Sequence, residues 1–228
     1  MDISSILRKR VAPELNHLYT VPPFQREAGA DCGWFCREHA LHTYFVARLL
    51  GIESDIRRGD FLVKSPGLPV ISSIDDTSDH AWCRVGDMLP VDLSLTLRHF
   101  GTPSQLRMPI CKVGTNGPYQ VWYSKDSTAA LKSPLHSVCY VEHEIMPLTH
   151  SDLLDDPYRF VFTASDDDPL SWHNLYGAEI YARITLHCFR VATGHAKTTR
   201  NRLSASDSPD WIFAEYPDAT PSIHALLN

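Results

Sequence analysis

The stretch "CREHALHTYFVARLLGI", residues 36–52, predicts the most regular helix of the chain. Its apolar residues Leu41, Phe45 and Leu49 recur at the spacing of one helix face. Gly51 suits the left-handed position just past a helix end, since glycine has no Cβ to clash there. We therefore expect a helix over residues 35–50 that ends before this glycine.

Cys36 falls within the first turn of this helix, at a place where a thiol can become reactive. The unpaired N–H groups of a helix N-terminus and a neighbouring imidazole both favour the thiolate, which is the nucleophilic form of cysteine. At helical spacing, Ala40, Thr43 and Ala47 lie beneath the thiol, and all three are small. The helix can therefore pack closely on a sheet and bring the sulfur near a strand-borne base. A buried structural thiol is the alternative.

Two later motifs, "DHAWCRV" and "PVDLS", offer a base in His80 and a carboxylate in Asp92. They read as two short strands around a turn at residues 86–87. Because side chains alternate across a strand, a regular two-residue turn would place the two groups on opposite faces. A three-residue loop over residues 85–87 would place His80 directly across from Asp92. We therefore predict such a loop, or a bulge, at this turn.

The order cysteine, histidine, aspartate in these motifs resembles the transglutaminase-like (papain-like cysteine protease) superfamily, especially its compact bacterial members. There the cysteine begins a helix that ends in a leucine-glycine-isoleucine type sequence. The spacing from Cys36 to Gly51 is similar, whereas the spacing from Cys32 is too long. The resemblance covers residues 31–95. It implies an α+β fold with the nucleophile helix packed on an antiparallel sheet, and we expect an additional C-terminal helix.

By that resemblance, Cys36 is the nucleophile, His80 the base and Asp92 the group that orients the histidine. Such an enzyme transfers an acyl group at an amide bond of a protein or peptide substrate through a thioester, without a cofactor. We favour hydrolysis, as by a protease, amidase or deamidase, because water is always present. A transglutaminase that crosslinks glutamine to an amine is one alternative, and a catalytically inactive binding or scaffold domain is another.

The oxyanion of the tetrahedral intermediate needs hydrogen-bond donors. The backbone N–H of Cys36 is one candidate. Trp34, Gln25 and Asn16 are open alternatives for the second donor. We expect Trp82, two residues after the histidine, to pack over the site and shield it.

Cys32 and Cys36, with His39 and His42 on the same predicted helix, also suggest a zinc site. The two histidines point away from the Cys36 side of that helix, however, and no second pair of ligands with finger-like spacing follows. We therefore expect no metal.

The composition is that of a soluble globular protein, with 43% hydrophobic and 21% charged residues. A formal charge of −6 gives no basic field to attract nucleic acid or an anionic membrane. The sequence shows neither a signal-peptide pattern at its start nor an apolar run of about 18 residues. We expect a cytoplasmic protein, or one exported by a signal-independent route, with its six cysteines reduced. The oligomeric state is left open.

We expect one domain over residues 1–228, because a chain of this length can bury a sizeable core. The superfamily-like core spans 31–95, the rest of the sheet and a C-terminal helix span 96–191, and a polar tail spans 192–228. The tail residues Trp211, Phe213 and Tyr216 suggest that part of it docks. Further predicted elements are a helix over 3–18 interrupted near Pro13, strands over 57–63, 120–124, 136–143 and 159–164, and a helix over 174–191.

Overall fold

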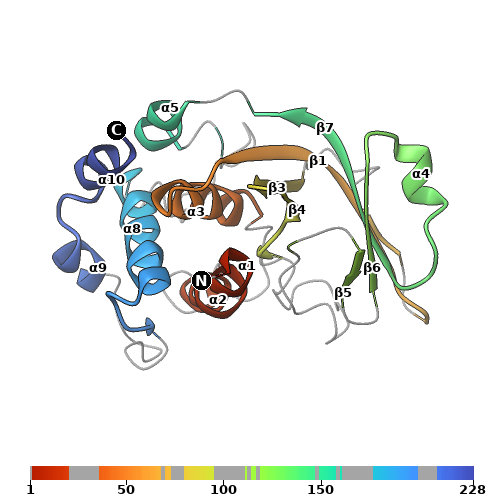
Figure 1. Ribbon diagram of the computed structural model, residues 1–228, viewed down its shortest axis with the longest axis horizontal. Helices are drawn as coiled ribbons and strands as arrows, with labels where there is room; N and C mark the ends of the chain where they lie inside the picture. The colour runs from red at the N-terminus through yellow and green to blue at the C-terminus, as the bar shows by residue number, and fades with distance from the viewer. Residues whose placement is uncertain are drawn as a thin grey trace.

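The computed structural model describes residues 2–20, 36–67, 70–72, 80–94, 111, 114–116, 119–146, 149–157, 160, 177–199 and 210–228. These residues form a mixed α+β fold, which confirms the expected class. Most helices gather at one end of the molecule, and a curved sheet extends away from them towards α4 (Figure 1).

The helices are α1 (Ile3–Ile6), the π-helical turn η1 (Leu7–Val11), α2 (Ala12–Thr20), α3 (Cys36–Leu49), α4 (Ser127–Leu131), α5 (His150–Asp155), α8 (Glu179–Thr193), α9 (Asp210–Glu215) and α10 (Ala219–Leu227). The strands are β1 (Ser54–Lys64), β2 (Ile71–Ser72), β3 (His80–Val85), β4 (Met88–Val91), β5 (Gly114–Asn116), β6 (Tyr119–Ser124) and β7 (Ser137–Ile145).

The long strand β1 lies at the centre of the sheet. The strand order is β4-β3-β1-β7-β6-β5, and β2 pairs with the end of β1 off this path. β1 is antiparallel to both β3 and β7, with Gly59 opposite His80 on one side and Phe61 opposite Tyr140 on the other. The centre of the sheet therefore brings together residues that are far apart in the sequence.

The expectation of a purely antiparallel sheet is wrong at one pair, because β6 and β7 run parallel. Parallel neighbours need a crossover of about a dozen residues, which a tight turn cannot supply. The segment between Ser124 and Ser137 contains α4 and makes this crossover. The sequence pattern predicted both strands but not their relative direction.

The helix α3 lies close against β3, as its small residues predicted. The thiol of Cys83 on β3 donates a hydrogen bond of 3.1 Å to the backbone carbonyl of Ala40. Ala40 and Ala47 are both buried in the core that α3 shares with α8 and one face of the sheet. The absence of long side chains beneath the helix start therefore allows strand and helix backbones to approach.

The end of α3 also follows the prediction. Gly51 has a φ of 75°, and its N–H donates to the carbonyl of Arg48. The N–H of Ile52 donates to the carbonyl of Ala47, which completes a Schellman motif. This turn sends the chain from α3 into β1.

The N-terminal helix is continuous where an interruption was expected near Pro13. A π-helical turn, η1, precedes the proline, and the N–H of Ala12 reaches back to the carbonyl of Leu7. Proline has no N–H to donate and crowds the preceding turn of an α-helix. The wider π turn accommodates the proline without ending the helix.

The C-terminal segment folds back onto the N-terminal helices. The fully buried His187 of α8 hydrogen-bonds to Glu14 of α2 at 2.8 Å and to the hydroxyl of Tyr216 at 2.9 Å. Trp211 and Phe213 pack against the main core. The prediction that part of the tail docks is confirmed for these residues.

The other predicted elements agree in part. The ranges 57–63, 120–124 and 136–143 fall on β1, β6 and β7, except that β7 begins one residue later, at Ser137. Phe160 is helical, while the rest of the predicted strand 159–164 lies outside the described residues. The predicted helix 174–191 begins only at Glu179, after Gly177 with its φ of 69°.

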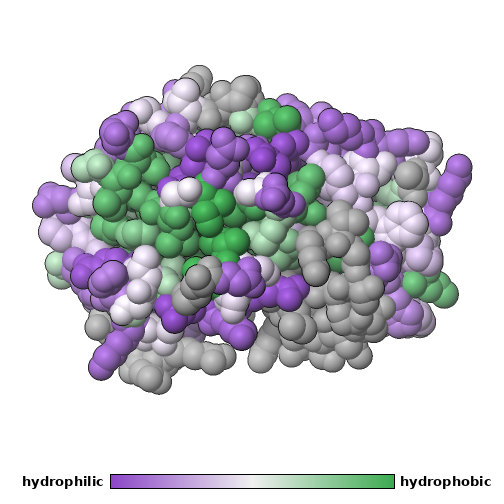
Figure 2. Space-filling model, viewed as in Figure 1, coloured by the Kyte–Doolittle hydropathy of each residue, from purple (hydrophilic) through white to green (hydrophobic). Residues whose placement is uncertain are grey.

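On the face seen in Figure 2, apolar residues gather over the helical half, and hydrophilic residues dominate towards β7. None of the helices in the described part of the chain is both long enough and apolar enough to cross a membrane.

Gly59 is the position where the sheet tolerates a side chain least. A Cβ there would overlap the carbonyl oxygen of Val141 and lie 3.0 Å from the backbone nitrogen of His143. Because these are backbone atoms at a register shift between β1 and β7, they cannot move aside cheaply. We expect Gly59→Ala to lower the free energy of unfolding by about 3 kcal/mol, measured by urea denaturation.

The matched control is Gly51→Ala. An added Cβ at this position meets open space but must adopt a positive φ. We expect a cost of about 1 kcal/mol from the backbone conformation alone. Equal costs for the two variants would contradict the close approach of β7 at Gly59.

Candidate functional site

Cys36, His80 and Asp92 come from three neighbouring element ends. Cys36 is the first residue of α3, His80 is the first residue of β3, and Asp92 follows the last residue of β4. Their exposed fractions are 3%, 2% and 2%. The three groups that the sequence singled out are therefore all enclosed by the fold.

His80 and Asp92 are hydrogen-bonded, with 2.7 Å between Nε2 and Oδ2. The turn between β3 and β4 has two residues, since Val85 pairs with Met88, and a register shift follows so that Cys83 pairs with Val91. The predicted bulge is confirmed, and the three-residue loop is wrong. The prediction that His80 lies directly across from Asp92 is also wrong. This register places Asp92 across from Trp82 and diagonal to His80, on the same face of the sheet.

Two further residues donate hydrogen bonds to the Asp92 carboxylate. Ser94 donates to Oδ1 through its backbone N–H at 2.9 Å and through its hydroxyl at 2.6 Å. Tyr140 of β7 donates to Oδ2 at 2.8 Å. Burial raises the pKa of Asp92, but the charge of His80 and these hydrogen bonds outweigh it, so the pKa is lowered overall. Asp92 is therefore an ionised carboxylate.

Aromatic rings enclose the imidazole of His80. The ring centroid of Phe61 lies 4.6 Å away, and those of Trp82 and Tyr140 each lie 6.0 Å away. Trp82 is fully buried in the aromatic cluster on this face of the sheet, as expected for a packing residue. Water is thus excluded from the surroundings of His80, which strengthens its interaction with Asp92.

The electrostatics of His80 involve both of its neighbours. Burial by itself lowers the pKa of His80, but the charges of Asp92 and then Cys36 outweigh burial, and hydrogen bonding adds to them. The pKa of His80 rises to about 10 as a result. Its second ring nitrogen, Nδ1, is buried and has no hydrogen-bond partner of standard geometry among the described residues.

The oxyanion candidates fall into two groups. Asn16 on α2 accepts a hydrogen bond of 3.2 Å from Nε2 of His39, one turn along α3 from Cys36. Trp34 and Gln25 lie outside the described residues, as does Cys32.

His39 and His42, the pair that suggested zinc, face α2 and α8 instead. His42 hydrogen-bonds to the hydroxyl of Tyr19 at 2.7 Å and to that of Thr185 at 2.9 Å. Burial, followed by the charge of His39, holds the pKa of His42 well below its usual value. Within the described ranges, no group of three or more histidine, cysteine, aspartate or glutamate side chains is arranged to hold a metal ion.

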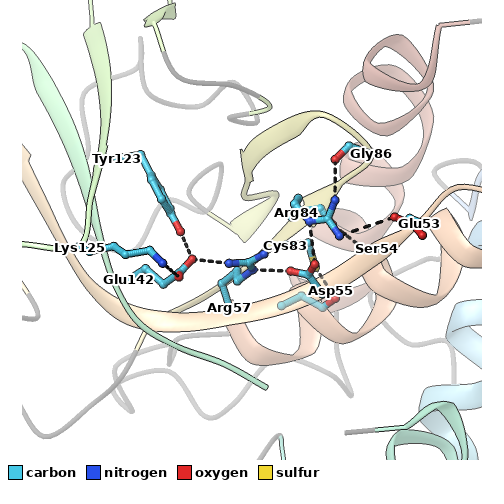
Figure 3. A network of polar contacts seen from close by, with 11 residues as sticks. Glu53, Ser54, Asp55, Arg57, Cys83, Arg84, Gly86, Tyr123, Lys125 and Glu142 are labelled. Atoms are coloured by element: carbon cyan, nitrogen blue, oxygen red, sulfur yellow. Dashed lines mark hydrogen bonds and ion pairs between the residues drawn. The ribbon is translucent and has the colours of Figure 1, made fainter. Parts of the chain in front are cut away.

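A polar network that sequence analysis missed crosses the sheet next to the aromatic cluster (Figure 3). Tyr123 and Arg57 both donate to Glu142, the latter at 2.6 Å. Arg57 also pairs with Asp55, which accepts a further bond of 2.7 Å from Arg84. The network therefore joins β6, β7, β1 and β3 by side chains as well as by backbone.

Sequence analysis also missed Tyr140 and Ser94. Ser94 had a local signal, since a serine two residues after an aspartate commonly satisfies its carboxylate. Tyr140 had none, because its contact with Asp92 depends on the order of strands in the sheet.

Comparison with known proteins adds no assignment. No protein-family model matches the chain, and neither a curated protein nor a solved structure is significantly similar to it.

The ion pair between His80 and Asp92 predicts how the stability of the protein depends on pH. The pKa of folded His80, about 10, lies above its ordinary 6.5, so its contribution is complete below pH 6.5 and lost as pH rises to about 10. The contribution of Asp92, whose folded pKa lies below its ordinary 3.8, is lost as pH falls below that value. Urea unfolding from pH 3 to 10 measures both limits.

The control is the double variant His80→Gln/Asp92→Asn, which keeps the side-chain sizes and removes both titrating groups. We expect wild type to lose stability relative to this variant between pH 6.5 and about 10. Parallel curves over that range would show that His80 is not held protonated by the fold.

Proposed function

We propose that this protein is a cysteine-dependent acyl-transfer enzyme that acts on amide bonds and has a transglutaminase-like core. One observation supports the proposal above all others. Buried His80 is hydrogen-bonded to buried Asp92 at 2.7 Å. Its pKa is raised by the charge of Asp92 and then by that of Cys36, which begins the 14-residue helix α3. Nucleophile, base and orienting group in this relation are the parts that thiol catalysis requires.

The first step forms a thioester. A protonated imidazole stabilises a neighbouring thiolate, and the positive end of the helix dipole at the start of α3 favours the same anion. The Cys36 thiolate attacks the amide carbon, so a carbon–sulfur bond forms and the carbonyl oxygen becomes an oxyanion. When the oxyanion collapses, the carbon–nitrogen bond breaks and His80 gives its proton to the leaving amine.

The second step releases the acyl group. Neutral His80 takes a proton from water, and the resulting hydroxide equivalent attacks the thioester carbon. The carbon–sulfur bond breaks, which returns the thiolate and yields a carboxylic acid. Asp92 accepts the Nε2–H bond throughout, so that Nδ1 remains the nitrogen that faces the reaction.

Backbone N–H groups at a helix N-terminus are suited to bind an oxyanion, and Cys36 lies at the start of α3. Among the candidates for a second donor, Asn16 is the one that the structure describes. It contacts His39, which lies one turn along α3 from Cys36. Hydrolysis is the proposed outcome, and an amine in place of water would give transglutaminase crosslinking by the same steps.

A mixed peptide library tests the proposal because it offers many amide substrates at once. Wild type is incubated with the library and analysed by mass spectrometry for cleaved, deamidated and crosslinked peptides. We expect cleavage or deamidation by wild type and none by Cys36→Ala. Hydroxylamine should intercept the thioester and yield peptide hydroxamates. Because His80 and Cys36 act as a unit, His80→Gln should lower the rate by about 10³-fold or more.

Cys139→Ala is the matched control, because this thiol is buried on β7 in the small cluster around Ala130 and α4. We expect it to retain the wild-type rate. Peptide products that persist in Cys36→Ala would overturn the proposal, and a folded wild type that leaves a broad library unchanged would favour a binding role.

A further inference from the structure

We propose that Tyr140 is a positioning residue for the candidate site. Its hydroxyl fixes the Asp92 carboxylate against His80 and shares the negative charge that holds the imidazole proton. The catalytic consequence of this inference rests on the proposed function, whereas its effect on His80 does not.

Tyr140 and His80 converge on the same carboxylate oxygen. Oδ2 of Asp92 accepts from Nε2 of His80 at 2.7 Å and from the hydroxyl of Tyr140 at 2.8 Å. The Ser94 donors occupy the other oxygen. The carboxylate is thus held at both ends, and its rotation is blocked while the histidine is bound.

The position of Tyr140 follows from the sheet. Strand β1 lies between β3 and β7, and Phe61 on β1 pairs with Tyr140 while its ring contacts His80. All three rings belong to one face, so the tyrosine reaches Asp92 across the intervening strand. Tyr140 is fully buried, which leaves its hydroxyl no solvent partner as an alternative.

The Tyr140 hydroxyl remains a donor at all relevant pH values. Burial and then the charge of Asp92 raise its pKa well above the usual value. Each hydrogen bond to a carboxylate withdraws some of its negative charge. Without the tyrosine donor, more charge would remain on Oδ2, and His80 would hold its proton more tightly. An imidazolium that releases its proton less readily is a weaker acid towards the leaving amine.

Tyr140→Phe tests the inference, because it removes one oxygen atom and keeps the ring. We expect the titration of His80, followed by NMR of its imidazole and assigned by comparison with His80→Gln, to move upward by roughly half to one pH unit. In the peptide assay, kcat should fall by about tenfold while KM stays unchanged, since the tyrosine touches no substrate.

Tyr123→Phe is the matched control. Tyr123 lies on the neighbouring strand β6 and also donates to a buried carboxylate, that of Glu142, as Figure 3 shows. Its removal costs a comparable hydrogen bond but leaves Asp92 untouched. We expect the His80 titration to stay at its wild-type position in this variant.

An unchanged His80 titration in Tyr140→Phe, or an equal shift in Tyr123→Phe, would overturn the inference. Should Tyr140→Phe fail to fold, Ser94→Ala removes a donor from Oδ1 and should produce a smaller shift in the same direction. Because the titration needs no substrate, it decides the inference even where the peptide assay finds no activity. If the His80 titration shifts in Tyr140→Phe but peptide products persist in Cys36→Ala, the proposed function is contradicted and the inference about Tyr140 is not.

Discussion

The buried carboxylate of Asp92 is the constraint on which the candidate site depends. An ionised group out of contact with water costs several kcal/mol unless charged and hydrogen-bonding partners compensate for it. Asp92 receives four hydrogen bonds, from His80, Tyr140 and two groups of Ser94. These partners lie on β3, on β7 and directly after β4, so the carboxylate is satisfied only when the sheet has the correct strand order.

The register of the strands is equally important. With a regular two-residue hairpin, Asp92 and His80 would face opposite sides of the sheet. The register shift between Cys83 and Val85 moves Asp92 to the side of His80. On the other side of β3, Gly59 of β1 lies opposite His80, where β1 has its own shift against β7. Two irregularities in neighbouring ladders thus flank the histidine, as is common at functional positions of sheets.

Local patterns in the sequence predicted what local physics determines. Helical spacing, small residues and a C-terminal glycine predicted α3 and its close contact with β3. Strand alternation predicted that the His80–Asp92 contact needs an irregular turn. The direction of β6 relative to β7, the reach of Tyr140 and the charge network around Arg57 were not predicted. All three depend on which distant strands become neighbours, and no short-range pattern encodes that choice.

Three of the buried histidines differ in how many of their ring nitrogens are hydrogen-bonded, and this difference bears on which of them can act as a base. His42 and His187 use both ring nitrogens in hydrogen bonds, and His187 is even paired with a buried carboxylate, Glu14. A pair of histidine and carboxylate is therefore not sufficient to indicate catalysis in this chain. In His80 the carboxylate occupies one nitrogen, while the other has no hydrogen-bond partner of standard geometry among the described residues. Of these three histidines, His80 alone combines a buried carboxylate partner with a second nitrogen outside such a bond, and this difference is why the proposed mechanism assigns the base to His80.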